Sequence, residues 1–246
     1  MTYDFEKTEQ QMAGFGKPQK HKKSIKQGAS RPQTEEAIKQ SIIKYQQGDL
    51  EGAKIELEET LQEDHTNSFA LGFLATIEKA LGNKERALKL FKRSTDISQD
   101  NPDILHNYSG LLKQCDPEKS IILSDKAVHI SPDNSRYLER NGYLKWQASD
   151  LENALEATLK ALRISPSLVD AHLNLGGIYK DLGNLDQALA STLKSIEIMP
   201  ENVDARRTLG GILLAIGKHS DGLKELRAAC GVIVFNLTTG FSVKQN

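Results

Sequence analysis

Apolar residues recur at spacings of three and four along most of the chain, in short runs that end at turn residues. The segment 169–202 shows this most clearly, with apolar positions at Leu175, Ile178, Leu182, Leu189, Leu193 and Ile196. These spacings predict two helices with one apolar stripe each, separated by Gly183-Asn184. Helices of about a dozen residues are marginal alone in water, so each must bury its stripe against a neighbour.

The same pattern returns every 34 residues. Pro132, Pro166 and Pro200 keep this interval, and so do the turn glycines Gly48 and Gly82. Three columns of small residues follow the units: Ser41, Ala75, Gly110, Gly142, Gly176 and Gly210; Ala53, Ala87, Ser120, Ala154, Ala188 and Gly222; Thr60, Ser94, Ala127, Ala161, Ser195 and Ala229. Small side chains that recur at the same position of successive units indicate where helices approach most closely. A fixed period of this length predicts a stacked array of helix pairs.

Residues 175–200 carry a family motif. Leu175, Gly176, Tyr179, Gly183, Ala188 and Pro200 fit the spacing L-G-x-x-Y-x-x-x-G-x-x-x-x-A with a closing proline. This motif resembles the tetratricopeptide repeat (TPR). The resemblance covers residues 34–236 and implies an all-α fold, a right-handed superhelical TPR solenoid of antiparallel helix pairs. About six units are expected, at 34–67, 68–101, 102–134, 135–168, 169–202 and 203–236.

Some positions depart from the family pattern. The eleventh position of four units holds a charge where an aromatic residue is expected: Lys44, Glu78, Lys113 and Lys145. The twenty-fourth position of three units holds a small polar residue instead of a large apolar one, which predicts looser packing there: Ser124, Thr158 and Thr192. The third unit is short between Gly110 and Ala127. We therefore expect a joint in the array within residues 100–117.

Both ends of the chain differ from the array. Residues 1–33 hold seven Lys or Arg and three Asp or Glu, a net charge of +4, without a helical apolar stripe. This composition predicts a disordered basic leader. Residues 231–246 alternate apolar and polar residues around Thr-Thr-Gly and predict a short C-terminal β-hairpin-like tail that overlaps the array end. An isolated hairpin is marginal in water, so the tail packs on the array, pairs with another chain or begins a further domain.

Motifs give little support for catalysis. The six histidines form no pair at metal-ligand spacing on one helix face, and His219-Ser220-Asp221 lacks the second histidine of an iron site. Phosphate-binding loops and nucleophile motifs are also missing. We therefore expect no catalytic residues, no metal, no cofactor and no small-molecule substrate. Because the net charge of the chain is −1, we take the leader as a solubilising segment rather than a contact to nucleic acid or membrane.

Three observations favour the cytoplasm. The first residues lack the basic and apolar regions of a secretory signal. No apolar run approaches the ~18 residues that span a bilayer. Cys115 and Cys230 lie in different repeats, without the spacing of a disulfide framework. We expect a cytoplasmic protein of bacterial type.

By the resemblance, the first helix of each unit lines a concave groove, and the residues at the second, fifth, sixth and ninth positions of the unit form the groove row that points into it. The candidate peptide-binding residues there are Tyr108, Arg136, Arg140, Tyr143, Asn174 and Arg207. Arg136 and Arg140 would offer two guanidinium groups to a carboxylate or phosphate, and Asn174 would hold a peptide backbone. Alternatively, Arg140 pairs with Asp170 on the surface, a contact without function.

Three functions stay open. The first, which the sequence favours, is a non-catalytic scaffold that binds a protein or peptide segment in the groove. The second is the substrate-recognition arm of a larger or truncated enzyme of glycosyltransferase, sulfotransferase or 2-oxoglutarate oxygenase type. The third is a homodimer in which the C-terminal tails of two chains pair edge to edge.

Overall fold

The computed structural model describes residues 32–230, 232–236 and 240–244. Helices make up nearly all of this part of the chain. In order they are α2 (Pro32–Gln46), α3 (Leu50–Glu63), α4 (Ser68–Ala80), α5 (Lys84–Ile97), α6 (Pro102–Leu112), α7 (Pro117–Ile130), α8 (Ser135–Gln147), α9 (Leu151–Ile164), α10 (Val169–Asp181), α11 (Leu185–Ile198), α12 (Val203–Ala215) and α13 (His219–Cys230). Two strands follow, β1 (Val232–Asn236) and β2 (Gly240–Lys244), which pair antiparallel with Ile233 opposite Val243.

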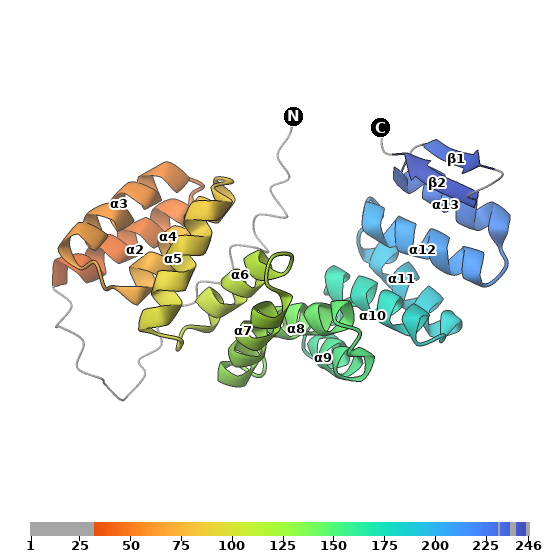
Figure 1. Cartoon of the computed structure of the whole chain (residues 1–246), viewed down its shortest axis with the longest axis horizontal. Coiled ribbons are helices and arrows are strands. Elements are labelled where there is room, and N and C mark those ends of the chain that lie inside the picture. The colour runs from red at the N-terminus through yellow and green to blue at the C-terminus, as the bar shows by residue number, and fades with distance from the viewer. Residues whose placement is uncertain (1–31, 231, 237–239, 245–246) are drawn as a thin grey trace. The chain divides into compact units, whose positions relative to one another are not determined.

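The helices form consecutive pairs, from α2 with α3 to α12 with α13 (Figure 1). The chain divides into two compact units after Ile130, so α2–α7 belong to the first and α8–β2 to the second. Within each unit neighbouring pairs also touch, as α3 touches α4 and α9 touches α10. The prediction of an all-helical array of pairs is confirmed.

The joint predicted within residues 100–117 is wrong, because the division between the units lies after Ile130. The short third pair, α6 and α7, stays inside the first unit. Its two helices are joined directly by Ser120 Oγ on α7, which donates to the Ser109 carbonyl on α6 at 2.8 Å, and Asp116 Oδ1 accepts from the Lys119 amide at the start of α7. A shortened turn therefore does not open the array.

The turn inside most pairs contains one residue with left-handed backbone. The φ angles of Gly48, Gly82, Gly183 and Gly217 are +81°, +85°, +79° and +82°. Glycine adopts this conformation without a Cβ penalty. In the fourth pair Ser149 takes the same place, with a φ of 61°. The regular spacing of these glycines in the sequence therefore reflects a left-handed backbone conformation that recurs in the turn of most pairs.

An asparagine caps the first helix of four pairs. In each case the side-chain oxygen accepts hydrogen bonds from backbone N–H groups of the first turn; these residues are Asn67, Asn101, Asn134 and Asn202. Asparagine is among the best N-cap residues because it satisfies N–H groups that have no partner within the helix. Helix α10 begins after Leu168 and lacks such a hydrogen bond.

The columns of small residues mark close contacts between paired helices, as predicted. A Cβ on Gly142 or Gly176 would lie closer than 3.0 Å to the hydroxyl of Thr158 or Thr192, respectively. Both threonines are fully buried, so the prediction of looser packing at these positions is wrong. The glycine brings the two helices close enough for a threonine to fill the space between them.

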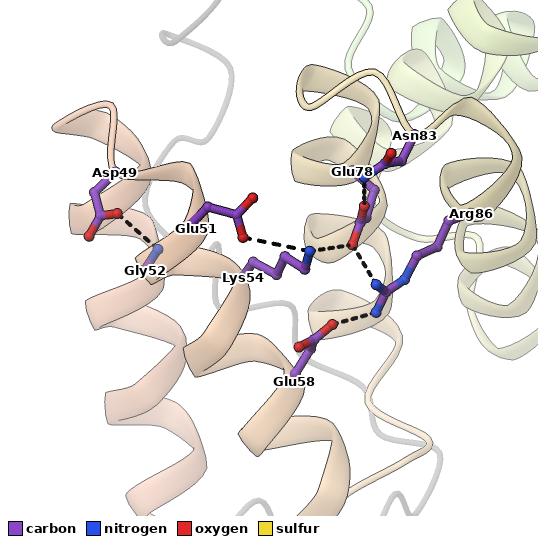
Figure 2. Close-up of polar contacts among 8 residues, drawn as sticks. All are labelled: Asp49, Glu51, Gly52, Lys54, Glu58, Glu78, Asn83 and Arg86. Carbon is purple, nitrogen blue, oxygen red and sulfur yellow. Dashed lines mark hydrogen bonds and ion pairs between the residues drawn. The ribbon is translucent and has the colours of Figure 1, made fainter.

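An ion-pair network replaces one of the expected aromatic residues (Figure 2). Glu78 on α4 is completely buried, and Asn83 donates to its Oε2 at 2.6 Å. Its Oε1 lies 3.0 Å from Arg86 Nη1 and 3.5 Å from Lys54 Nζ. Arg86 also pairs with Glu58. Helices α3, α4 and α5 are thereby joined, and the buried carboxylate is compensated within the first unit.

Three architectural expectations stay predictions. The basic leader, residues 1–33, lies outside the described residues apart from Pro32 and Gln33, which begin α2. The hairpin-like tail, residues 231–246, includes positions 231, 237–239 and 245–246, which are also outside them. The third expectation concerns the array itself: its right-handed superhelical course and the limits of its units.

Candidate functional site

One stripe of α8 carries polar and aromatic side chains. Arg136, Glu139, Tyr143 and Trp146 follow each other at intervals of three, four and three residues, so they lie along one side of the helix. All four residues are half-buried. Helix α8 touches α10, the first helix of the next pair, and both belong to the second unit.

Glu139 links the two helices near the start of this stripe. Asn174 on α10 is buried and donates from Nδ2 to Glu139 Oε1 at 2.8 Å. Burial raises the pKa of the Glu139 carboxyl, and Asp170 adds to that rise, whereas Arg140, Arg136 and the hydrogen bond from Asn174 oppose it. The net effect is a carboxyl that ionises less readily than one in water.

Trp146 links the same helices farther along. Its Nε1 donates to Asp181 Oδ2 at 2.6 Å. Its ring lies directly on Gly177, where a Cβ would come closer than 3.0 Å to the ring carbons. Tyr143 contacts it edge-on, with ring centroids 6.2 Å apart and an angle of 80° between the planes. The two aromatic rings are therefore held in place before any partner arrives.

The two arginines near the start of α8 differ from Glu139 and Trp146 in that no acidic side chain of the described residues holds them. Within the described residues, neither Arg136 nor Arg140 forms an ion pair within 4.0 Å. The surface pair between Arg140 and Asp170, which the sequence allowed, is not formed. Both guanidinium groups therefore keep their hydrogen-bonding capacity for an incoming anion.

We call this surface the α8–α10 face. It consists of Arg136, Glu139, Arg140, Tyr143 and Trp146 from α8 and of Asp170, Asn174, Gly177 and Asp181 from α10. Guanidinium groups lie toward the start of α8, and the aromatic pair lies toward its end. Such a surface can hold an extended segment by charge-assisted hydrogen bonds at one end and by apolar contact at the other.

The structure brings four of the six predicted site residues together, because Arg136, Arg140 and Tyr143 lie on α8 and Asn174 on α10. Tyr108 is in the first unit. It is only 3% exposed and is stacked on Phe91, with ring centroids 5.4 Å apart. Tyr108 is therefore part of the core of its own unit.

Arg207 lies apart from this group, on α12. It is exposed, and its Nη1 donates to Asp204 Oδ1 at 2.7 Å. Its Nε lies 3.4 Å from Cys230 Sγ on α13. Both contacts lie within the last helix pair, so the guanidinium of Arg207 is already engaged.

Five residues of the α8–α10 face were not among the predicted site residues: Glu139, Trp146, Asp170, Gly177 and Asp181. Glu139 stands at the fifth position of its unit, which belongs to the predicted groove row, so the sequence contained a signal for it. Trp146 and Asp181 stand at the twelfth and thirteenth positions of successive units. Only the hydrogen bond between them shows that they belong to the site.

The described residues contain neither a metal-site cluster nor a membrane-spanning helix. In residues 32–230, 232–236 and 240–244, no three His, Cys, Asp or Glu side chains gather as a metal site. His219 and Asp221 are exposed in the first turn of α13. In the same part of the chain, no helix has the length and apolar character needed to cross a bilayer.

Comparison with known proteins places the fold. Residues 169–202 match the family model described as tetratricopeptide repeat. A crystal structure of PilW, a widely conserved type IV pilus biogenesis factor, superposes with a TM-score of 0.68 at 19% identity, over 80% of this chain and 94% of that one. A tetratricopeptide repeat protein from Parabacteroides merdae superposes with a TM-score of 0.65 at 22% identity, over 80% of this chain and 79% of that one. Residues 169–202 therefore match a tetratricopeptide repeat, and the fold of the chain resembles that of TPR proteins.

A third TPR structure is YrrB, described as a TPR protein with an unusual peptide-binding site. It superposes on this chain with a TM-score of 0.60 at 19% identity, over 77% of this chain and 100% of YrrB. At these identities the likeness concerns the fold alone. Curated protein sequences give no significant match.

Proposed function

We propose that this protein is a non-catalytic TPR scaffold that binds an extended protein segment on its α8–α10 face. The observation that carries the proposal is the pairing of two guanidinium groups without ion-pair partners with an aromatic pair fixed against Gly177. TPR proteins in general bind other proteins, and the description of YrrB as having a peptide-binding site agrees with this use of the fold.

The hydrogen bonds between α8 and α10 make the face suitable for binding. Because Glu139 and Asn174 satisfy each other and Trp146 is held by Asp181, few side chains must be ordered when a partner arrives. Fixing such side chains beforehand lowers the entropic cost of association. Arg136 and Arg140 supply directional hydrogen bonds, and Tyr143 and Trp146 supply flat apolar area.

The proposal includes the wider context expected from the sequence. The array over residues 34–236 would continue the same row of first helices as a right-handed superhelix. Arg207 on α12 would be a further contact only after a partner's acidic group replaces its bond to Asp204. The hairpin-like tail would cover the end of α13, which touches both strands. A reducing, cytoplasmic setting in a bacterial cell would suit Cys115 and Cys230, which are both free. No cofactor takes part.

The test is affinity capture from native lysate with three baits: the wild-type chain, the double variant Arg140→Ala/Tyr143→Ala and the control Arg163→Ala. Arg163 is an exposed arginine on α9, the second helix of the same pair. We expect the double variant to lose the partners that wild type and control retain. Its melting temperature should fall little, because neither residue is in the buried core. Identical partners for all three baits would disprove the proposal.

A further inference from the structure

The α8–α10 face has a direction, with its charged groups at one end and its aromatic groups at the other. An α-helix rises about 1.5 Å per residue. Along the axis of α8, Arg140 therefore precedes Trp146 by about 9 Å and Arg136 precedes it by about 15 Å. A ligand that contacts both ends must place two different side chains roughly 9–15 Å apart.

The acidic groups of the face are mostly engaged within the protein. Glu139 accepts from Asn174, and Asp181 accepts from Trp146. Asp170 is exposed in the first turn of α10. An incoming anion is repelled by Asp170 on that side and attracted by Arg136 and Arg140 on the α8 side. The charge distribution thus directs an anion to the start of α8.

The two guanidinium groups of Arg136 and Arg140 match the oxygens of a carboxylate or of a phosphate. A phosphate group brings about twice the charge of a carboxylate, so its attraction to the arginines and its repulsion by Asp170 both increase. An Asp or Glu side chain supplies the anion without any modification of the partner, and we take it as the occupant of this end.

From this arrangement we infer which sequence motif the partner carries; this inference rests on the proposed function. The bound segment carries an Asp or Glu and a large apolar or aromatic residue three or four positions apart. The carboxylate contacts Arg136 and Arg140, and the apolar side chain packs on Tyr143 and Trp146. A β-extended segment advances about 3.3 Å per residue with alternating side chains, so residues four positions apart share a side and span about 13 Å. A polyproline II segment advances about 3.1 Å per residue with three residues per turn, so residues three positions apart share a side and span about 9 Å.

The chain contains one tryptophan, Trp146, so its fluorescence reports directly on this face. The full-length protein is titrated with Gly/Ser peptides that carry one Glu and one Phe. The two residues stand one, three, four or seven positions apart, in both orders along the peptide. We expect the best peptide to have a spacing of three or four and to bind about tenfold more tightly than that with adjacent residues. Equal affinity at all spacings would overturn the inference.

The role of the carboxylate is tested on the peptide, which leaves the protein unchanged. Replacing the peptide Glu by Gln should weaken binding to the wild-type chain about tenfold. The same replacement should have little effect on binding to Arg136→Gln/Arg140→Gln, and its full effect should remain in the control Arg163→Gln. An equal loss in all three proteins would show that the arginines do not receive the carboxylate. Tighter binding of a phosphoserine peptide would overturn the choice of carboxylate.

This inference and the proposed function can fail separately. If affinity capture depends on Arg140 and Tyr143 but peptide affinity ignores spacing, the sequence rule is wrong and the scaffold stands. If capture is the same for all baits, the proposed function fails. Circular dichroism of Arg136→Gln/Arg140→Gln confirms that the variant is folded, as expected for two side chains without ion pairs in the described structure.

Discussion

Ser149 occupies a turn position at which four other pairs have glycine, and its φ of 61° is in the left-handed region. A side chain with a Cβ is strained there, because the Cβ approaches the following carbonyl oxygen. We expect Ser149→Gly to raise the free energy of unfolding by about 0.5–1 kcal/mol. Urea denaturation measures the change. Ser149→Ala is the control, and a similar gain in it would show that strain is not the cause.

Glu139 has a pKa above its ordinary value in the folded protein, chiefly because it is buried. A carboxyl with a raised folded pKa weakens the fold when it is ionised, and this penalty disappears as pH falls through that pKa. Glu139→Gln keeps an acceptor for Asn174 and cannot ionise. We expect a higher melting temperature for the variant at pH 8.

The advantage of Glu139→Gln should shrink as pH falls and should vanish near and below the ordinary pKa of 4.5. Thermal melts of both proteins from pH 8 to pH 4 measure this. An advantage that is constant over the whole range would mean that a neutral packing effect, not the ionised carboxylate, causes the difference.

Individual residues differ in how far the sequence predicts them. The small columns were predictable, because a clash between backbones forbids large side chains at the same position in every unit. The roles of Glu139 and Trp146 were harder to predict, because neither residue belongs to a column that recurs from unit to unit. Tyr108 shows the opposite error, since a tyrosine in the groove row proved to be core, stacked on Phe91.

At the scale of the helix, Gly177 on α10 and Gly211 on α12 occupy the same position of successive units. The ring of Trp146 lies on Gly177, whereas at Gly211 an added Cβ would have only Lys180 Nζ near it, at 4.0 Å. We expect Gly177→Ala to destabilise the protein by about 1–3 kcal/mol through this clash. Gly211→Ala should stabilise it by up to about 1 kcal/mol, because alanine favours a helix.

Chemical denaturation of the two alanine variants compares them directly. The emission of Trp146 should shift in Gly177→Ala, because its ring must move away from α10, and should stay unchanged in Gly211→Ala. Opposite signs of the two stability changes are required. Equal changes would mean that the contact between Trp146 and Gly177 does not hold these helices together.

Helices and turns were predicted well because their causes are local. Apolar spacing, asparagine caps and turn glycines act within a few residues. The packing at Thr158 and Thr192 was mispredicted, because the size of a threonine says nothing about how near the facing helix lies. That distance is decided by the glycine opposite, on another helix.

For the whole molecule, the open question at the C-terminal end is the role of the tail. Helix α13 touches both β1 and β2, so removal of residues 231–246 should expose part of it. We expect the 1–230 truncation to melt at a lower temperature than the full chain. Light scattering on both proteins determines whether the tail also joins two chains. An unchanged melting temperature would show that the tail does not stabilise the array end.

By itself the sequence determined the repeat, its period and the helix pairs, because each of these depends on periodic spacing and local turn chemistry. Only the tertiary structure decided where the chain divides, that Tyr108 is core, and that Arg136 and Arg140 keep no acidic partner in the described residues. These features depend on which side chain of one helix meets which side chain of the next. Small differences in the distance between packed helices decide such encounters, and no local pattern records them.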